Sequence, residues 1–298
     1  MSARNPRADR SATAAVCRAA RHHAANAARA LGSLRPSDVD VHGARKQIKK
    51  SRAALRLLRA ALAGATYRRE DAALRTSARA LNAVRDARVL ARTLDALRRR
   101  RVGLGKDKTA AAMARMLRRR QVQARHQLRV LPELLAGARS TLQQVQRRAR
   151  RWRVAQLGWS GLEPAFRRIY RAGRRAAHAA KDHPDTLTLH EWRKKVQYLW
   201  HALQILKPLQ CRALPKVGPL ARGLADYLGE EHDLALLHAA ALAFARRQGP
   251  VSEALLAGIE RRRRSLRRKA MAVGKRLYAQ KSRPLAARVG RCCTPPRH

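Results

Sequence analysis

Apolar residues recur every three or four positions along most of the chain, which is the spacing of amphipathic helices. Gly and Pro residues interrupt this pattern at intervals and mark the connections. The pattern predicts four helices in the first half, near residues 7–31, 37–64, 70–101 and 106–155. It predicts four more in the second half, near 163–181 and 188–206, then one ending near 248 and one over 252–280. We therefore expect an all-α protein.

Two of the predicted helices begin with a capping-box pattern, Ser37 with Asp40 and Thr188 with Glu191. Each introduces a basic stretch led by a histidine. The first is VHGARKQIKKSRAALRLLR (41–59), and the second is LHEWRKKVQYLWHALQIL (189–206).

A second pair of similar segments supports a duplication. LNAVRDARVL (81–90) is similar to LGEEHDLALL (228–237), at almost the same separation as the two histidine-led stretches. We predict two helical bundles related by an internal pseudo-two-fold axis. The first repeat would span residues 1–157 and the second 158–280, followed by a disordered basic tail over 281–298.

The first histidine-led stretch places its charges on one side of a helix. At 100° per residue, one broad stripe carries His42, Arg45, Lys46, Lys49, Arg52, Arg56 and Arg59, and the apolar residues lie opposite. No acidic residue occurs between Asp40 and Glu70, and like charges at this spacing destabilise an isolated helix. A bound polyanion would compensate them, although a solvated helix face is the simpler alternative.

Composition strengthens the polyanion interpretation. The 298 residues include 68 Lys and Arg against 19 Asp and Glu, a formal net charge of +49. A field of this sign attracts nucleic acid, an anionic membrane surface or inorganic polyphosphate. The N-terminal segment does not read as a secretory signal, and the charge-free runs are too short to span a bilayer. The four cysteines show no C-x-x-C spacing. We expect a cytoplasmic protein without membrane insertion.

The chemistry of single residues favours binding over catalysis. His42 and His190 lie near predicted helix N-termini, where an imidazole N–H and free backbone N–H groups can bind phosphate oxygen. Neither histidine has a metal ligand three or four residues further along its stripe, so we expect no metal. No Walker A loop is present, so we expect no catalytic residue, no cofactor and no enzyme activity. The acidic group Glu230, Glu231 and Asp233 is predicted to cap a helix, to pair with arginines or to order the interface between the repeats.

The chain resembles the CHAD family (conserved histidine α-helical domain) over residues 8–280. The resemblance lies in the histidine followed by cations at +3, +4, +7 and +10, in the second histidine-led copy, and in the paired downstream segments. It implies two antiparallel helical bundles, related by a pseudo-two-fold, around a basic central groove or pore, and binding of inorganic polyphosphate. It also implies association with polyphosphate granules, with granule-associated proteins as candidate partners. The triphosphatase motif E-x-E-x-K, found in some fused members, does not occur here.

The resemblance assigns a binding role to His42, Arg45, Lys46, Lys49 and Arg52 in the first copy and to His190, Arg193 and Lys194 in the second. Arg56 and Arg59 extend the first stripe, and His201 lies near the second. The second copy departs from the family pattern, because Gln197 and Trp200 stand where cations are expected. We therefore predict that the first copy provides more of the affinity.

The alternative function is nonspecific nucleic-acid binding, which the charge alone would allow in vitro. Single-strand binders usually offer aromatic platforms, and Phe, Tyr and Trp together number only 11 here. The basic segment RRRRSLRRK (261–269) is expected to extend the binding surface.

Overall fold

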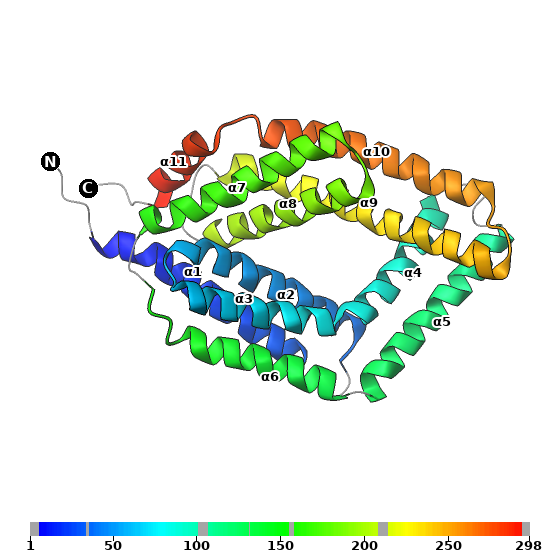
Figure 1. The fold of residues 1–298 in the computed structure, drawn as a ribbon, viewed down its shortest axis with the longest axis horizontal. Coiled ribbons are helices and arrows are strands. Elements are labelled where there is room, and N and C mark those ends of the chain that lie inside the picture. Colours follow the sequence, from blue (N-terminus) through cyan, green and yellow to red (C-terminus); the bar gives the residue numbers. More distant parts are fainter. Residues whose placement is uncertain are drawn as a thin grey trace.

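Helices form all the regular secondary structure in the computed structural model, which describes residues 6–33, 36–100, 107–130, 132–154, 158–207 and 214–293 (Figure 1). The α-helices are α1 (Pro6–Ala30), α2 (Asp38–Leu57), α3 (Gly64–Ala80), α4 (Asn82–Arg100), α5 (Lys108–Val130), α6 (Pro132–Ala149), α7 (Trp159–Asp182), α8 (Thr186–Leu206), α9 (Leu214–Gln248), α10 (Glu253–Leu277) and α11 (Ser282–Cys293). A short 3-10 helix, η1 (Leu58–Ala60), follows α2. The prediction of an all-α protein is confirmed.

The start of α2 is the capping box that the sequence predicts. The Asp40 backbone N–H donates to Ser37 Oγ over 3.2 Å, and the Ser37 backbone N–H donates to Asp40 Oδ2 over 2.8 Å. The start of α8 differs from the prediction. Its N-cap is Asp185, whose carboxylate accepts the Thr188 backbone N–H at 2.7 Å, so Thr188 lies inside the first turn.

The predicted helix over 70–101 is two helices that join at Leu81. The chain leaves the helical ladder there, and the Leu81 side chain is fully buried. Arg45 of α2 donates to the Ala78 carbonyl oxygen, which lies in the last turn of α3, and to the Asn82 side chain. A guanidinium therefore satisfies backbone oxygen that the helix end leaves exposed. Beyond this joint α4 turns away from the bundle (Figure 1).

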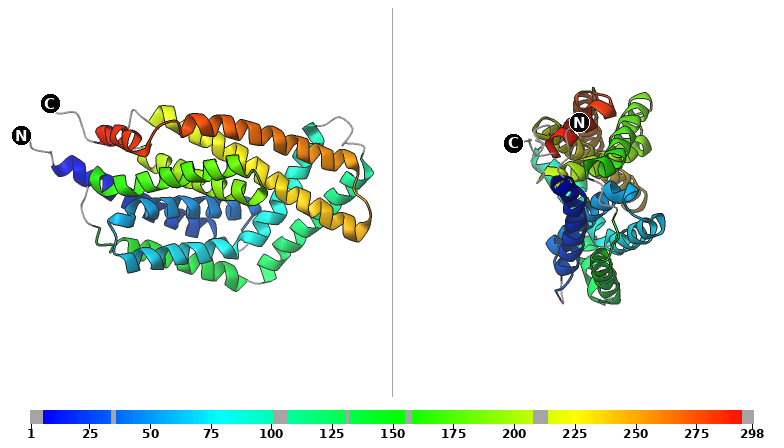
Figure 2. Two further views of the ribbon diagram at one scale, coloured as in Figure 1. Left: turned by 45° about the horizontal axis from the view of Figure 1, so that its top comes forward. Right: turned by 90° about the vertical axis from the view of Figure 1, so that its left-hand side faces the viewer.

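The helices enclose two apolar cores. The larger one lies between α1, α2, α3, α6, α7, α8 and α11, with the first turns of α9 and the end of α10, and it includes Trp192, Phe166 and Ile48. The smaller one lies between α4, α5, the second half of α9 and the first half of α10, and it includes Leu94, Met113 and Ile259. Figure 2 shows the long helices α9 and α10 running from one core to the other.

The prediction of a disordered tail over residues 281–298 is wrong for most of this segment. Ser282–Cys293 form α11, which packs on α7 through the buried side chains Leu285, Ala286 and Val289. These three apolar residues lie within five positions, with arginines between and around them. Such a short amphipathic segment forms a stable helix only when its apolar face packs on another element, which here is α7. Residues 294–298 lie outside the described part of the chain, as does the predicted repeat boundary at 157. The division into two repeats remains a prediction.

Among the described helices, none is both long enough and apolar enough to cross a membrane.

Candidate anion-binding site

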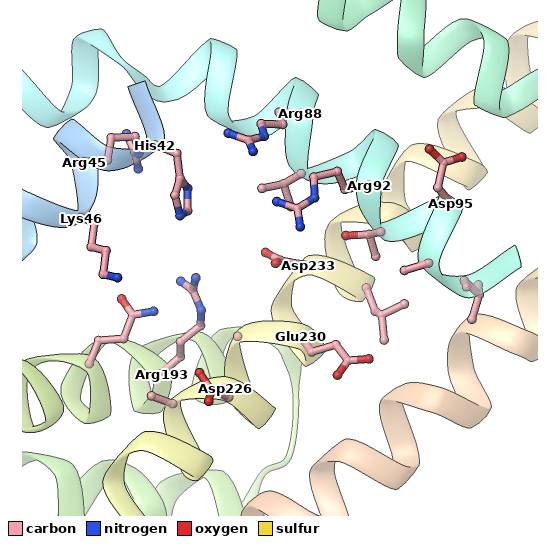
Figure 3. Close-up of a pocket in the computed structure, with 18 of the residues that line it drawn as sticks. His42, Arg45, Lys46, Arg88, Arg92, Asp95, Arg193, Asp226, Glu230 and Asp233 are labelled. Carbon is pink, nitrogen blue, oxygen red and sulfur yellow. The ribbon is translucent and has the colours of Figure 1, made fainter. Parts of the chain in front are cut away.

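A cavity of about 810 Å³ lies where the two cores meet. Its walls come from α2, α4, α8 and α9 (Figure 3), and Arg262 of α10 also lines it. The buried faces of these helices are fixed by the two cores, so their opposite faces present polar side chains to a common space.

Cations outnumber acids in the lining. The Lys and Arg residues are Arg45, Lys46, Lys49, Arg88, Arg92, Arg99, Arg100, Arg193 and Arg262. The acids are Asp38, Asp95, Asp226, Glu230 and Asp233. Three of these acids form ion pairs with arginines outside the cavity, and the pairs are Asp38 with Arg125, Asp95 with Arg118, and Asp226 with Arg222. The cations of the lining are therefore only partly neutralised from within.

The α2 wall carries the first histidine-led stretch. Buried Val41, Ala44 and Ile48 hold the helix against the larger core, which leaves His42 and Lys46 facing the cavity (Figure 3). Burial lowers the pKa of His42, and the nearby charges of Arg88 and the α2 lysines lower it further. In the free protein this imidazole is therefore held neutral at neutral pH.

The α4 wall was not predicted. Arg88 and Arg92 are one turn apart on α4 and face His42 across the cavity (Figure 3). Arg88 also donates to the Asp38 backbone oxygen at the start of α2. The i, i+4 spacing of the two arginines was visible in the segment after residue 81. What the sequence did not show was the break at Leu81, which turns this helix face towards α2.

The α8 wall is less charged, as the two replaced positions predict. Arg193 points into the cavity (Figure 3), and Gln197 and Trp200 of the same helix also line it. His201 lies at the base of the cavity with 7% of its surface exposed, and its Nδ1 lies 3.2 Å from Gln204 Oε1. Burial lowers the pKa of His201 to about 4, so it is a neutral polar group there.

The α9 wall contributes Asp226, Glu230 and Asp233, three of the five acids in the lining. Glu230 accepts two hydrogen bonds from the Arg262 guanidinium, at 2.8 and 2.9 Å, and a third from Arg100 at 3.0 Å. Its neighbour Glu231 is buried and accepts hydrogen bonds from Arg263 and Arg267. The prediction that this acidic segment pairs with arginines is confirmed for both glutamates.

Three cations of the first stripe do not line the cavity. Arg52 and Arg56 turn to the buried Asp71 of α3, with N–O distances of 3.0 and 3.7 Å. The Arg56 guanidinium also lies 3.8 Å from the centre of the Tyr198 ring. Arg59 belongs to η1, and its guanidinium lies 5.2 Å from the ring centre of Tyr67. The predicted stripe therefore divides into a half that faces the cavity and a half that joins helices.

Two residues of the second copy also lie outside the lining. The ring of His190 packs on that of His232, with centres 4.5 Å apart and 3.2 Å between the two Nδ1 atoms. Lys194 pairs with Glu191, three residues before it. Of the predicted residues, the cavity thus brings together His42, Arg45, Lys46, Lys49, Arg193 and His201.

The arrangement suits a flexible polyanion. Guanidinium and ammonium groups on facing helices can donate charge-assisted hydrogen bonds to successive phosphoryl groups. Within the described residues, no group of three or more His, Cys, Asp or Glu side chains is placed to hold a metal ion.

Comparison with known proteins places this fold. A sequence model of the CHAD domain matches residues 14–242. The structure is similar to PptA from Streptomyces chartreusis, with a TM-score of 0.63 and 18% identity over 91% of this chain and 99% of that chain. It is also similar to the CHAD domain from the plant Ricinus communis, with a TM-score of 0.59 and 15% identity over 93% of this chain and 91% of that chain. No curated protein matches the sequence.

Proposed function

The chain belongs to the CHAD domain family, and we propose that it binds inorganic polyphosphate in the cavity between α2, α4, α8 and α9. We propose that this binding is not coupled to catalysis. The observation that carries the proposal is the convergence of Lys46 and Lys49 from α2, Arg88 and Arg92 from α4, and Arg193 from α8 on one space.

The cavity favours polyphosphate over nucleic acid for a physical reason. Polyphosphate presents a charge at every repeat and has no bases to accommodate. Trp200 is the only aromatic residue in the described cavity lining apart from the two imidazoles, so the walls offer little stacking surface. Nonspecific binding of nucleic acid through the overall positive charge remains the second candidate, because the net charge of +49 acts on any polyanion.

The proposed cellular setting follows from the ligand. A cytoplasmic protein with this site would associate with polyphosphate granules and contact other granule-bound proteins.

A competition titration tests the proposed function. Labelled long-chain polyphosphate is bound to the purified protein at rising salt and displaced with unlabelled polyphosphate, single-stranded RNA or duplex DNA. We expect polyphosphate to compete at the lowest concentration, with affinity falling steeply as salt rises through counterion release. Equal competition by RNA or DNA at physiological salt would contradict the proposal. The length of the polyphosphate is followed in the same samples, and shortening over time would reveal a hydrolase instead.

A further inference from the structure

Helical geometry divides the basic segment 261–269 of α10 into two sets of arginines. One set turns inward. Arg262 is bound to Glu230 at the cavity, and Arg263 and Arg267 both donate to Glu231, which is 2% exposed. These arginines stabilise the contact between α9 and α10, because each one neutralises a carboxylate that packing has partly or fully removed from water.

The second set turns outward. Arg261, Arg264 and Arg268 are exposed and fall within about 60° of one another around the helix axis. None of the three forms an ion pair or side-chain hydrogen bond with a residue in the described part of the chain, in contrast to their three inward neighbours. The sequence contains no Asp or Glu after Glu260. We call these three residues the α10 ridge.

The α10 ridge shares one helical turn with a residue of the cavity lining. Arg262, which lines the cavity, lies between Arg261 and Arg264 in the chain, about 100° to 160° around the helix axis from the ridge residues. A flexible polyanion that leaves the cavity past Arg262 can therefore reach the ridge by passing around α10. We propose that the α10 ridge is an outer binding surface for the part of a polyphosphate chain that extends beyond the cavity. This inference rests on the proposed function and adds to it a dependence on chain length.

The charge pattern leaves the ridge open to a bound anion. Like charges three and four residues apart raise the free energy of a helix unless counter-charge lies nearby. On the inward face of α10 the protein supplies that counter-charge to Arg262, Arg263 and Arg267 through Glu230, Glu231 and Glu260. On the ridge it supplies none from the described residues, which leaves three guanidinium groups available to successive phosphoryl groups.

The test compares two triple variants of the full chain with the same charge. One is Arg261→Gln, Arg264→Gln and Arg268→Gln. The matched control is Arg168→Gln, Arg171→Gln and Arg175→Gln, three exposed arginines with identical spacing on α7, which do not line the cavity. Affinity is measured for tripolyphosphate and for long-chain polyphosphate at several salt concentrations, and circular dichroism checks that each variant is folded.

We expect the ridge variant to lose about tenfold in affinity for long chains. The dependence of log K on log salt should become shallower by about two to three, because fewer counterions are displaced. Affinity for tripolyphosphate should stay within about twofold of wild type, and the α7 variant should resemble wild type for both ligands. Equal losses of affinity in the two variants, or an equal loss of affinity for the two ligands, would contradict the proposed role of the ridge. If the unaltered protein does not prefer polyphosphate to nucleic acid, the proposed function itself fails.

Discussion

The Arg52 guanidinium of α2 donates to the buried carboxylate of Asp71 on α3, with 3.0 Å between Nε and Oδ1. Arg56 and Arg75 approach the same carboxylate, at 3.7 and 2.6 Å. These arginines hold the pKa of Asp71 below its usual value, although burial acts in the opposite direction. The far end of the α2 stripe is thus compensated within the fold, while the near end faces the cavity.

Arg52→Gln should therefore reduce stability and leave binding almost unchanged. Removing one partner leaves a buried carboxylate with less counter-charge, at a cost of about 2 kcal/mol in the free energy of unfolding. Urea unfolding and polyphosphate titration on the same preparation check the two effects. A tenfold loss of affinity in folded protein would show that Arg52 contacts the ligand after all.

Glu230→Gln should strengthen polyphosphate binding. In the free protein the Glu230 carboxylate accepts hydrogen bonds from Arg262 and Arg100, and a phosphoryl group would bind the same two guanidinium groups. A neutral amide releases both guanidinium groups and removes a repulsive charge, and we expect an affinity gain of about threefold to tenfold. The matched control is Glu133→Gln on α6, an exposed acid outside the cavity lining. Unchanged or weaker binding by Glu230→Gln would show that the carboxylate does not compete with ligand.

His201 should make the fold sensitive to acid. Its pKa is about 4 in the folded protein and close to 6.5 in the unfolded chain, so the unfolded chain takes up the proton first. Stability is therefore fully present above about pH 6.5 and is lost as the pH falls towards 4, by up to about 3 kcal/mol. Unfolding of the wild type and of His201→Gln is compared at about pH 7, above this window, and at about pH 5, within it. The variant should lose less stability between these two values. An identical loss in both would mean that His201 does not titrate as its burial requires.

His42 should make binding depend on pH in the opposite sense. Its pKa is lowered in the free protein by burial and by the cations around it, and a bound polyanion would raise it again. A group whose pKa rises on binding takes up a proton, so affinity should increase as the pH falls through about 6.5. His42→Gln should flatten this dependence between about pH 7.5 and 5.5. Parallel pH profiles for the wild type and the variant would exclude His42 from the site.

The periodicity of the sequence was sufficient for the helical class and for much of the site, because both depend on local pattern. The Ser37 cap, the stripe that begins at His42 and the weaker second copy could all be read from residues within a few turns of one another. The pairing of Glu230 and Glu231 with arginines also followed from composition, since cations surround them on every side.

What could not be predicted depends on residues far apart in the chain. Arg88 and Arg92 join the cavity because α4 breaks from α3 at Leu81, and the hydrogen bonds from Arg45 that accompany this break span more than 30 residues. Arg52 and Arg56 were assigned to the ligand because their partner, Asp71, lies on the next helix. The sequence did not predict the helix α11, because its short apolar face is stabilised only by packing on α7.

The role of the cavity is tested most directly by the affinity of a triple variant for long-chain polyphosphate at physiological salt. Lys46→Gln, Lys49→Gln and Arg92→Gln remove three cations from the α2 and α4 walls, and the α7 triple variant removes three from an outer surface. We predict a loss of at least about 100-fold for the cavity variant and less than about threefold for the α7 variant. Equal losses from both would mean that net charge, and not the cavity, binds the polymer.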